Sequence, residues 1–390
     1  MIIVAYLVAV LLPLLFLYVI YALDLYASGT FRLVAACFVW GLVAFGLAFA
    51  VNTTVYNQVL QPVLGMSSRE AMTATVVLVA PVAEEILKSL MLIYLARRAD
   101  FTYFVDGAIY GFAAGIGFSI LENFFYIAQA GANQSALLVI SRSFSTCLMH
   151  GSASALVGVS IGRFRYGHGW SRVLSAVLGW GAAIVLHSAF NRVVESAEGT
   201  ALLLGAVGIG LGSVVLIVLF IRWGLAEERR WIEDTLNIGM RVTDKEKALV
   251  RELNGVDELL APVRERFGAE RTDLIQDFLL KQAQLGIKQK TAGMSTDERL
   301  RAELQQQIDG LQDEMNELRR KVGVYCMYYV RTIFPPEMTP LWSNLEKRVQ
   351  QQQQAQEQGE VRFNMWGSLK ATADARAARA GSSDVGTDSA

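Results

Sequence analysis

Long apolar runs alternate with short polar loops over the first 223 residues of the chain. Each run is long enough to cross a bilayer, because about 20 helical residues span the roughly 30 Å of hydrocarbon. The first run lacks a basic leading segment and is too long for a cleaved signal peptide, so we expect it to remain as a helix. The pattern predicts seven spans, at about residues 2–23, 31–51, 71–96, 104–128, 136–161, 171–194 and 199–222.

The pattern changes after Trp223, where apolar positions recur at helical spacing in a charged background. Steps of four and three residues predict a coiled coil at about 297–322, with its seam at Leu304, Ile308, Leu311, Met315, Leu318 and Val322. This seam can close as a hairpin within the chain or in a homo-oligomer. We therefore predict a transmembrane domain at 1–223, a helical region at 224–348, and a low-complexity, disordered tail at 349–390.

Composition agrees with two unlike parts. Residues 1–223 hold 11 of the 35 Lys and Arg and 9 of the 36 Asp and Glu, about 9% of their positions, against about 31% in the rest. The first part is too apolar for a soluble domain, and the net charge of −1 shows no basic excess for nucleic acid. Three widely spaced Cys carry no disulfide or zinc-finger signal. The fold class predicted is an all-α polytopic bundle.

The charges in the loops predict an orientation. Basic residues are concentrated on one side of the predicted bundle, at Arg32, Arg97, Arg98, Arg163, Arg165, Arg172, Arg222, Arg229 and Arg230, and the opposite side has only Arg69 and Arg192. Loops rich in Lys and Arg stay in the cytoplasm, so this bias predicts an amino terminus outside the cell and a carboxyl-terminal region in the cytoplasm. The membrane expected is the plasma membrane.

Several polar residues fall inside the predicted spans: Glu84, Glu85, Lys88, Glu122, Asn123, His150, His187 and Asn191. Ionisable groups are costly in a bilayer, so each is by default a candidate for function. Lys88 lies four residues from Glu84 and three from Glu85, so it can neutralise one carboxylate and leave the other available. The alternative for this cluster is a neutral ion pair that fixes helix register. Asp106 and Arg142 lie near span ends and fit interfacial charges better than chemistry.

Small residues form stripes beside these polar groups. Two such stripes run along the fourth and fifth predicted spans, at Gly107, Gly111, Gly115 and Ser119, and at His150, Ser154, Gly158 and Gly162. Small residues let helix backbones approach closely, so we expect these spans to pack together and the polar groups to share one cavity.

The ordered set of motifs resembles the PrsW family of intramembrane proteases. It comprises E-E-x-x-K at Glu84, Glu85 and Lys88, F-x-x-x-E at Phe118 and Glu122, His150, and H-x-x-x-N at His187 and Asn191. The resemblance covers roughly residues 70–195, within the wider superfamily of CAAX prenyl proteases and bacteriocin-processing enzymes. Many members of the family are expected to have an acidic residue before the Asp-Gly pair at 106–107, whereas this chain has Val105 there.

The resemblance implies hydrolysis of a peptide bond by an activated water. Glu84 would be the general base and Glu85 the partner of Lys88, although helix geometry also allows the reverse. His150 would hold the water, and His187 and Asn191 would donate to the oxyanion. Glu122 would position water, bind a metal or set the protonation of a histidine. Zinc would use Glu122, His150 and His187, and a metal-free glutamate mechanism needs the same residues.

The substrate expected is a membrane-anchored protein such as an anti-sigma factor, cut on its extracytoplasmic side in regulated intramembrane proteolysis and signal transduction. Further partners expected are the lipid bilayer and, through the coiled coil, a second copy or a cytoplasmic protein. A polytopic transporter or receptor with a structural polar core is the alternative function.

Overall fold

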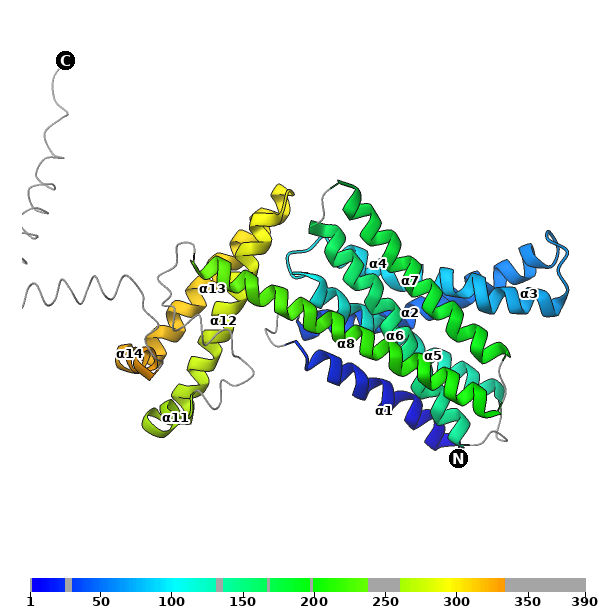
Figure 1. The fold of residues 1–390 in the computed structure, drawn as a ribbon, viewed down its shortest axis with the longest axis horizontal. Coiled ribbons are helices and arrows are strands. Elements are labelled where there is room, and N and C mark those ends of the chain that lie inside the picture. Colours follow the sequence, from blue (N-terminus) through cyan, green and yellow to red (C-terminus); the bar gives the residue numbers. More distant parts are fainter. Residues whose placement is uncertain are drawn as a thin grey trace, which may run out of the picture. The chain divides into compact units, whose positions relative to one another are not determined.

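The computed structural model describes residues 2–24, 30–130, 136–166, 169–196, 199–237 and 260–333, and no strand occurs within these ranges (Figure 1). The predicted all-α fold class is confirmed. The first part of the chain forms α1 (Ile2–Tyr21), α2 (Phe31–Val55), the π-helix η1 (Tyr56–Leu60), α3 (Ser68–Ala74), the π-helix η2 (Thr75–Val79), α4 (Ala80–Leu95), α5 (Phe104–Ala130), α6 (Ala136–Tyr166), α7 (Gly169–Ser196) and α8 (Gly199–Asn237).

Within the described part of the chain, six helical segments are long and apolar enough to cross a membrane: α1, α2 with η1, α5, α6, α7 and α8. The chain is therefore an integral membrane protein, although the sequence predicted seven spans rather than six. The predicted span at 71–96 is helical but divided into α3, η2 and α4, and α4 alone has 16 residues. Its charged residues and the change of helix type explain the difference.

Helices α5 and α6 form the centre of the bundle. In each of them 94% of the spanning window is buried, whereas the share is 17–28% in α1, α2, α7 and α8. The outer helices expose large apolar side chains such as Leu11, Val43 and Val177, which suits contact with lipid. The other helices of the bundle thus surround α5 and α6, which have little contact with lipid.

The two predicted stripes of small residues join α5 to α6. A Cβ added at Gly111 would overlap the backbone carbonyl of Ser154, and one added at Gly115 would overlap that of His150. The helices therefore meet backbone to backbone over this stretch. Because Glu122 and His150 lie on these two helices, the contact also determines how close their side chains come.

The interrupted segment α3–η2–α4 begins at a capping box formed by Ser67 and Glu70. Five residues of π-helix, Thr75–Val79, then separate α3 from α4. Pro81 lies in the first turn of α4, a position that tolerates proline because its N–H would have no partner within that helix. Wide π turns occur frequently at functional sites, and this one immediately precedes the acidic pair of α4.

The rest of the described chain is also helical. Helix α8 continues without a break to Asn237, so the predicted domain limit after residue 223 stays a prediction. The last helices are α11 (Ala261–Phe267), α12 (Ala269–Met294), α13 (Glu298–Val322) and α14 (Val324–Ile333).

Helix α13 packs against α12 and buries the seam residues Leu304, Ile308 and Leu311. The predicted seam thus closes within the chain as a hairpin, supported by an ion pair between Lys281 Nζ and Glu314 Oε2 at 2.6 Å. Pairing with a second copy stays a prediction. Residues 238–259 and 334–390, including the predicted tail at 349–390, lie outside the described residues.

The backbone contact between α5 and α6 predicts the effect of a larger side chain. Gly111→Val should prevent close packing and destabilise the protein by about 1–3 kcal/mol, because overpacking forces backbone shifts. Gly46→Val in α2 is the matched control, since nothing lies within 4 Å of a Cβ there. Thermal unfolding in detergent measures both variants. Equal unfolding midpoints for the two would contradict the packing described.

Candidate active site

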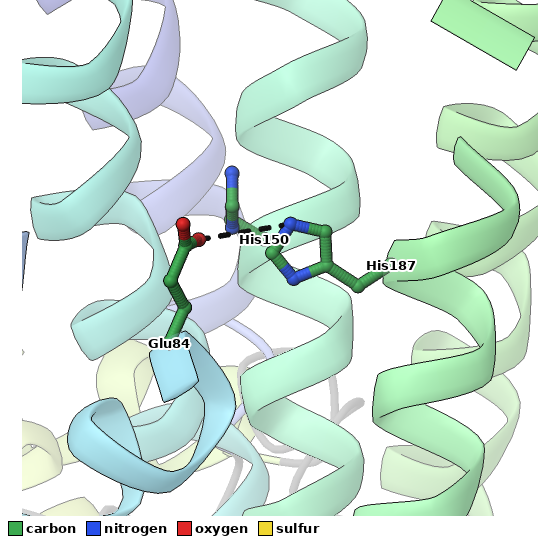
Figure 2. A group of neighbouring side chains, drawn as sticks. All are labelled: Glu84, His150 and His187. Carbon is green, nitrogen blue, oxygen red and sulfur yellow. Dashed lines mark ion pairs between the residues drawn. The ribbon is translucent and has the colours of Figure 1, made fainter. Parts of the chain in front are cut away.

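Four helices bring the predicted polar residues together inside the bundle. Glu84, Glu85 and Lys88 come from α4, while His150 comes from α6 and His187 from α7. All five are buried. Figure 2 shows Glu84, His150 and His187 pointing toward one another, and the rings of the two histidines lie 4.6 Å apart between centroids. Glu122 joins the group from α5.

Glu85 is held by three donors. Lys88 Nζ donates to Glu85 Oε1 at 2.6 Å, and His187 Nδ1 lies 2.9 Å from the same oxygen. Ser154 Oγ on α6 donates to Glu85 Oε2 at 3.2 Å. Both carboxylate oxygens are therefore engaged, and the pairing of Lys88 with Glu85 rather than Glu84 agrees with the sequence interpretation.

His150 uses both of its ring nitrogens. Lys88 Nζ lies 2.9 Å from His150 Nδ1, and an ammonium group can only donate, so Nδ1 must accept. The proton of the neutral ring is then on Nε2, which donates to Glu122 Oε2. His150 thus connects the Lys88–Glu85 pair to Glu122.

Glu84 has a different environment from its neighbour. Asn52 Nδ2 of α2 donates to Glu84 Oε1 at 3.3 Å, but Glu84 Oε2 has no hydrogen-bond partner among the described residues. His187 Nε2 lies 3.7 Å from this oxygen. If Nδ1 of His187 donates to Glu85, its Nε2 presents a lone pair toward Glu84. Two acceptors thus face each other across a gap that one water molecule can bridge.

Apolar and aromatic groups surround the cluster and hold α4. Phe118 packs 5.1 Å from the ring of His150, and Lys88 Nζ lies 4.5 Å from the centre of the Phe118 ring. Trp40 Nε1 donates to the backbone carbonyl of Leu87 at 3.0 Å. This enclosure strengthens each electrostatic contact, because the local dielectric constant is low.

The donors that come closest to a metal-binding arrangement are Glu84, His150 and His187, whose ligand atoms all lie within 4.8 Å of one another. The sequence had instead favoured Glu122 with the two histidines. The reason for the difference is that Glu122 is engaged by His150 Nε2, while Glu84 turns its second oxygen toward His187.

Three other polar residues that the sequence analysis discussed, Asn191, Asp106 and Arg142, make contacts outside this cluster. Asn191 Nδ2 donates to the backbone carbonyl of Val76 in η2 at 2.9 Å, so one of its N–H groups positions the π-helix. Asp106 Oδ2 accepts from the backbone N–H of Thr102 at 2.6 Å. Arg142 lies 3.6 Å from the centre of the Tyr126 ring. These last two contacts fit structural roles.

Two residues of the cluster were not predicted as site residues. Ser154 was assigned to the packing stripe, and the spacing of four residues from His150 could have placed it on the same helix face. Asn52 follows the predicted second span directly, in the sequence Val51-Asn52-Thr53. A single amide at the end of an apolar run gives no signal of which residue it will meet.

Comparison with known proteins agrees with this geometry. No curated protein and no solved structure matches the chain. Residues 29–224, half of the chain, match the family described as PrsW family intramembrane metalloprotease. This range contains every residue of the cluster, from Asn52 to Asn191. The four-helix cluster of carboxylates, lysine and histidines therefore lies in a chain that belongs to the PrsW family of intramembrane proteases.

Proposed function

We propose that the protein hydrolyses a peptide bond of a membrane-anchored substrate with Glu84 as the general base. The single observation that supports this is the pair of facing acceptors, Glu84 Oε2 and His187 Nε2, 3.7 Å apart in a buried site. A water between them would donate one hydrogen to each and direct a lone pair toward a scissile carbonyl. Glu84 would take the proton as the water attacks.

The other residues would keep this arrangement in place. Glu85 orients His187 through Nδ1, and Lys88 compensates the charge of Glu85. His150 links Lys88 to Glu122. In the proposed mechanism these residues position the base and its histidine. The second N–H of Asn191 is the proposed oxyanion donor, because the first is committed to Val76.

The residues present do not fit a catalytic zinc ion as they are arranged. Such a site needs three protein ligands with free lone pairs. Glu84 Oε2 and His187 Nε2 meet this requirement, but both nitrogens of His150 are hydrogen-bonded, one of them to the cationic Lys88. Two ligands remain. We therefore propose a metal-free glutamate mechanism, although the family description names a metalloprotease.

The proposed substrate is a single-span membrane protein such as an anti-sigma factor, cut near the extracytoplasmic side. The basic bias of the loops supports an outside amino terminus in the plasma membrane. With that orientation, Glu84 and His150 lie between the middle of the bilayer and its outer third. The helical region after residue 223 would regulate the protease or bind a partner protein from the cytoplasmic side.

Replacing the proposed base tests the mechanism. Glu84→Gln should lower the rate of cleavage about 10²- to 10⁴-fold, because the amide cannot accept the proton. Glu195→Gln makes the same chemical change on an exposed residue of α7 and should be neutral. Membrane proteomes of cells that express wild type or either variant would reveal the cleaved protein. Undiminished cleavage by Glu84→Gln would exclude Glu84 as the base.

Asn52 gives a second test, because it is the one donor to Glu84 among the described residues. Asn52→Leu should lower kcat about 10- to 100-fold, the cost of a lost hydrogen bond to a charged group, and leave KM nearly unchanged. Asn57→Leu is the control, since Asn57 is exposed in the nearby π-helix η1. A rise in KM alone would instead assign Asn52 to substrate binding.

Metal content tests the metal-free mechanism directly. Protein purified in detergent should contain far less than one zinc ion per chain by elemental analysis and should keep its activity after strong chelation. His187→Ala should leave the metal content unchanged. Stoichiometric zinc that disappears in His187→Ala, together with activity that chelation abolishes, would establish a metalloprotease.

A further inference from the structure

A cavity lies away from the proposed active site, where the ends of α4 and α6 meet α7 and the segment before α13. Its volume is about 540 Å³, in the range of sites that bind small molecules. Arg97, Arg165 and Asp297 contribute its charged groups, and its apolar wall includes Ile93, Ile161 and Trp180. The cavity thus combines two cations with an extended apolar surface.

The guanidinium of Arg165, in this cavity, has more N–H donors than there are acceptors bonded to it. Its Nη1 donates to the backbone carbonyls of Arg98, at 3.0 Å, and of Phe101. Its Nε and Nη2 are buried and have no hydrogen-bond partner within the described part of the chain. A buried guanidinium with unmade hydrogen bonds is costly, and an anionic oxygen is the acceptor that a guanidinium binds best. The geometry therefore favours an anion beside Arg165.

Among the described residues that line the cavity, Asp297 is the acidic one, and one of its oxygens is already engaged. Asp297 caps α13, where its Oδ1 accepts from the backbone N–H groups of Arg299 at 3.0 Å and Leu300 at 3.3 Å. No hydrogen bond from Arg165 to Asp297 is found among the described residues, and Arg165 Nε and Nη2 remain without an acceptor there. Two arginines against one engaged aspartate leave the cavity with an excess of positive charge.

The polar and apolar parts of the cavity lie at different depths. Arg165 is next to Tyr166, where the spanning helix α6 ends. Arg97 follows the end of α4 at Leu95 and lies at the same end of the bundle, because Arg165 Nη1 donates to the carbonyl of the neighbouring Arg98. Trp180 is 11 residues, or about 16 Å, along α7 from its start at Gly169. A phospholipid is arranged in the same way across the membrane, with its charged phosphate at the membrane surface and its acyl chains deeper in the bilayer.

We propose that this cavity binds one anionic phospholipid, with the phosphate between Arg97 and Arg165 and an acyl chain along Ile93, Ile161 and Trp180. The bound lipid would contact both the start of α13 and the helices that carry the active site. Trp180 Nε1 donates to Ser89 Oγ at 3.3 Å, and Ser89 follows Lys88. The lipid would thus join the α12–α13 hairpin to α4 and α7.

The test measures lipid binding to the delipidated full chain in detergent. Native mass spectrometry with phosphatidylglycerol, phosphatidylcholine and inorganic phosphate distinguishes an anionic lipid from a zwitterionic one and from free phosphate. We expect retention of phosphatidylglycerol alone. Arg97→Gln and Arg165→Gln should each weaken its binding about tenfold, the loss of one charge-assisted hydrogen bond.

Arg163→Gln is the matched control. Arg163 is exposed on the same stretch of α6, lies 5.0 Å from the centre of the Trp223 ring and does not line the cavity, so its variant should bind normally. If Arg165→Gln fails to fold, Arg97→Gln carries the test, because Arg97 is exposed. Equal binding of the two lipids, unchanged binding by Arg97→Gln, or saturation by inorganic phosphate would each overturn the proposal.

Discussion

The backbone contact between α5 and α6 is the constraint on which the candidate active site depends. Glycines on both helices let the chains approach until carbonyl groups occupy the space of a missing side chain. This packing brings the helix that carries Glu122 against the helix that carries His150, and the other spanning helices surround the pair. Within a membrane, close packing of this kind replaces the hydrophobic driving force that water supplies elsewhere.

The same enclosure explains the hydrogen-bond network of the site. A charge in a dry interior is stable only when it is paired and its remaining hydrogen bonds are made. Lys88 therefore contacts both Glu85 and His150, and Glu85 accepts from three side chains. Glu84 is the exception, with one oxygen bonded to Asn52 and the other facing His187. Of the acidic pair, Glu84 is therefore the carboxylate at which reactivity is expected.

Much of this arrangement could be predicted from the sequence, because apolar length and small-residue spacing are local properties. The runs of apolar residues identified the membrane helices, and the glycine spacing identified the faces of α5 and α6 that touch. The acidic pair and Lys88 were identified for the same reason, since charges within apolar runs are rare. The pairing of Lys88 with Glu85 rather than Glu84 was favoured but not required by helix geometry.

Other features depend on how helices approach one another, which spacing along one helix does not determine. The contact of Asn52 with Glu84 joins two helices, and its residues are 32 positions apart. The engagement of Glu122 by His150, and the grouping of Glu84 rather than Glu122 with the two histidines, also arise between helices. For the α13 seam, the sequence allowed a hairpin or an oligomer, and only the packing of α12 beside it distinguished them.

The π-helix η2 determines in which direction the acidic face of α4, with Glu84 and Glu85, points around the helix axis. A π turn holds about one residue more than an α turn, and each residue of an α-helix advances the side chains by about 100°. Residues of α4 are therefore rotated, relative to α3, away from the positions that an unbroken 3.6-residue repeat would give. Deleting one residue between Thr75 and Val79 would turn the side chain of Glu84 toward a different neighbour while leaving its sequence motif intact.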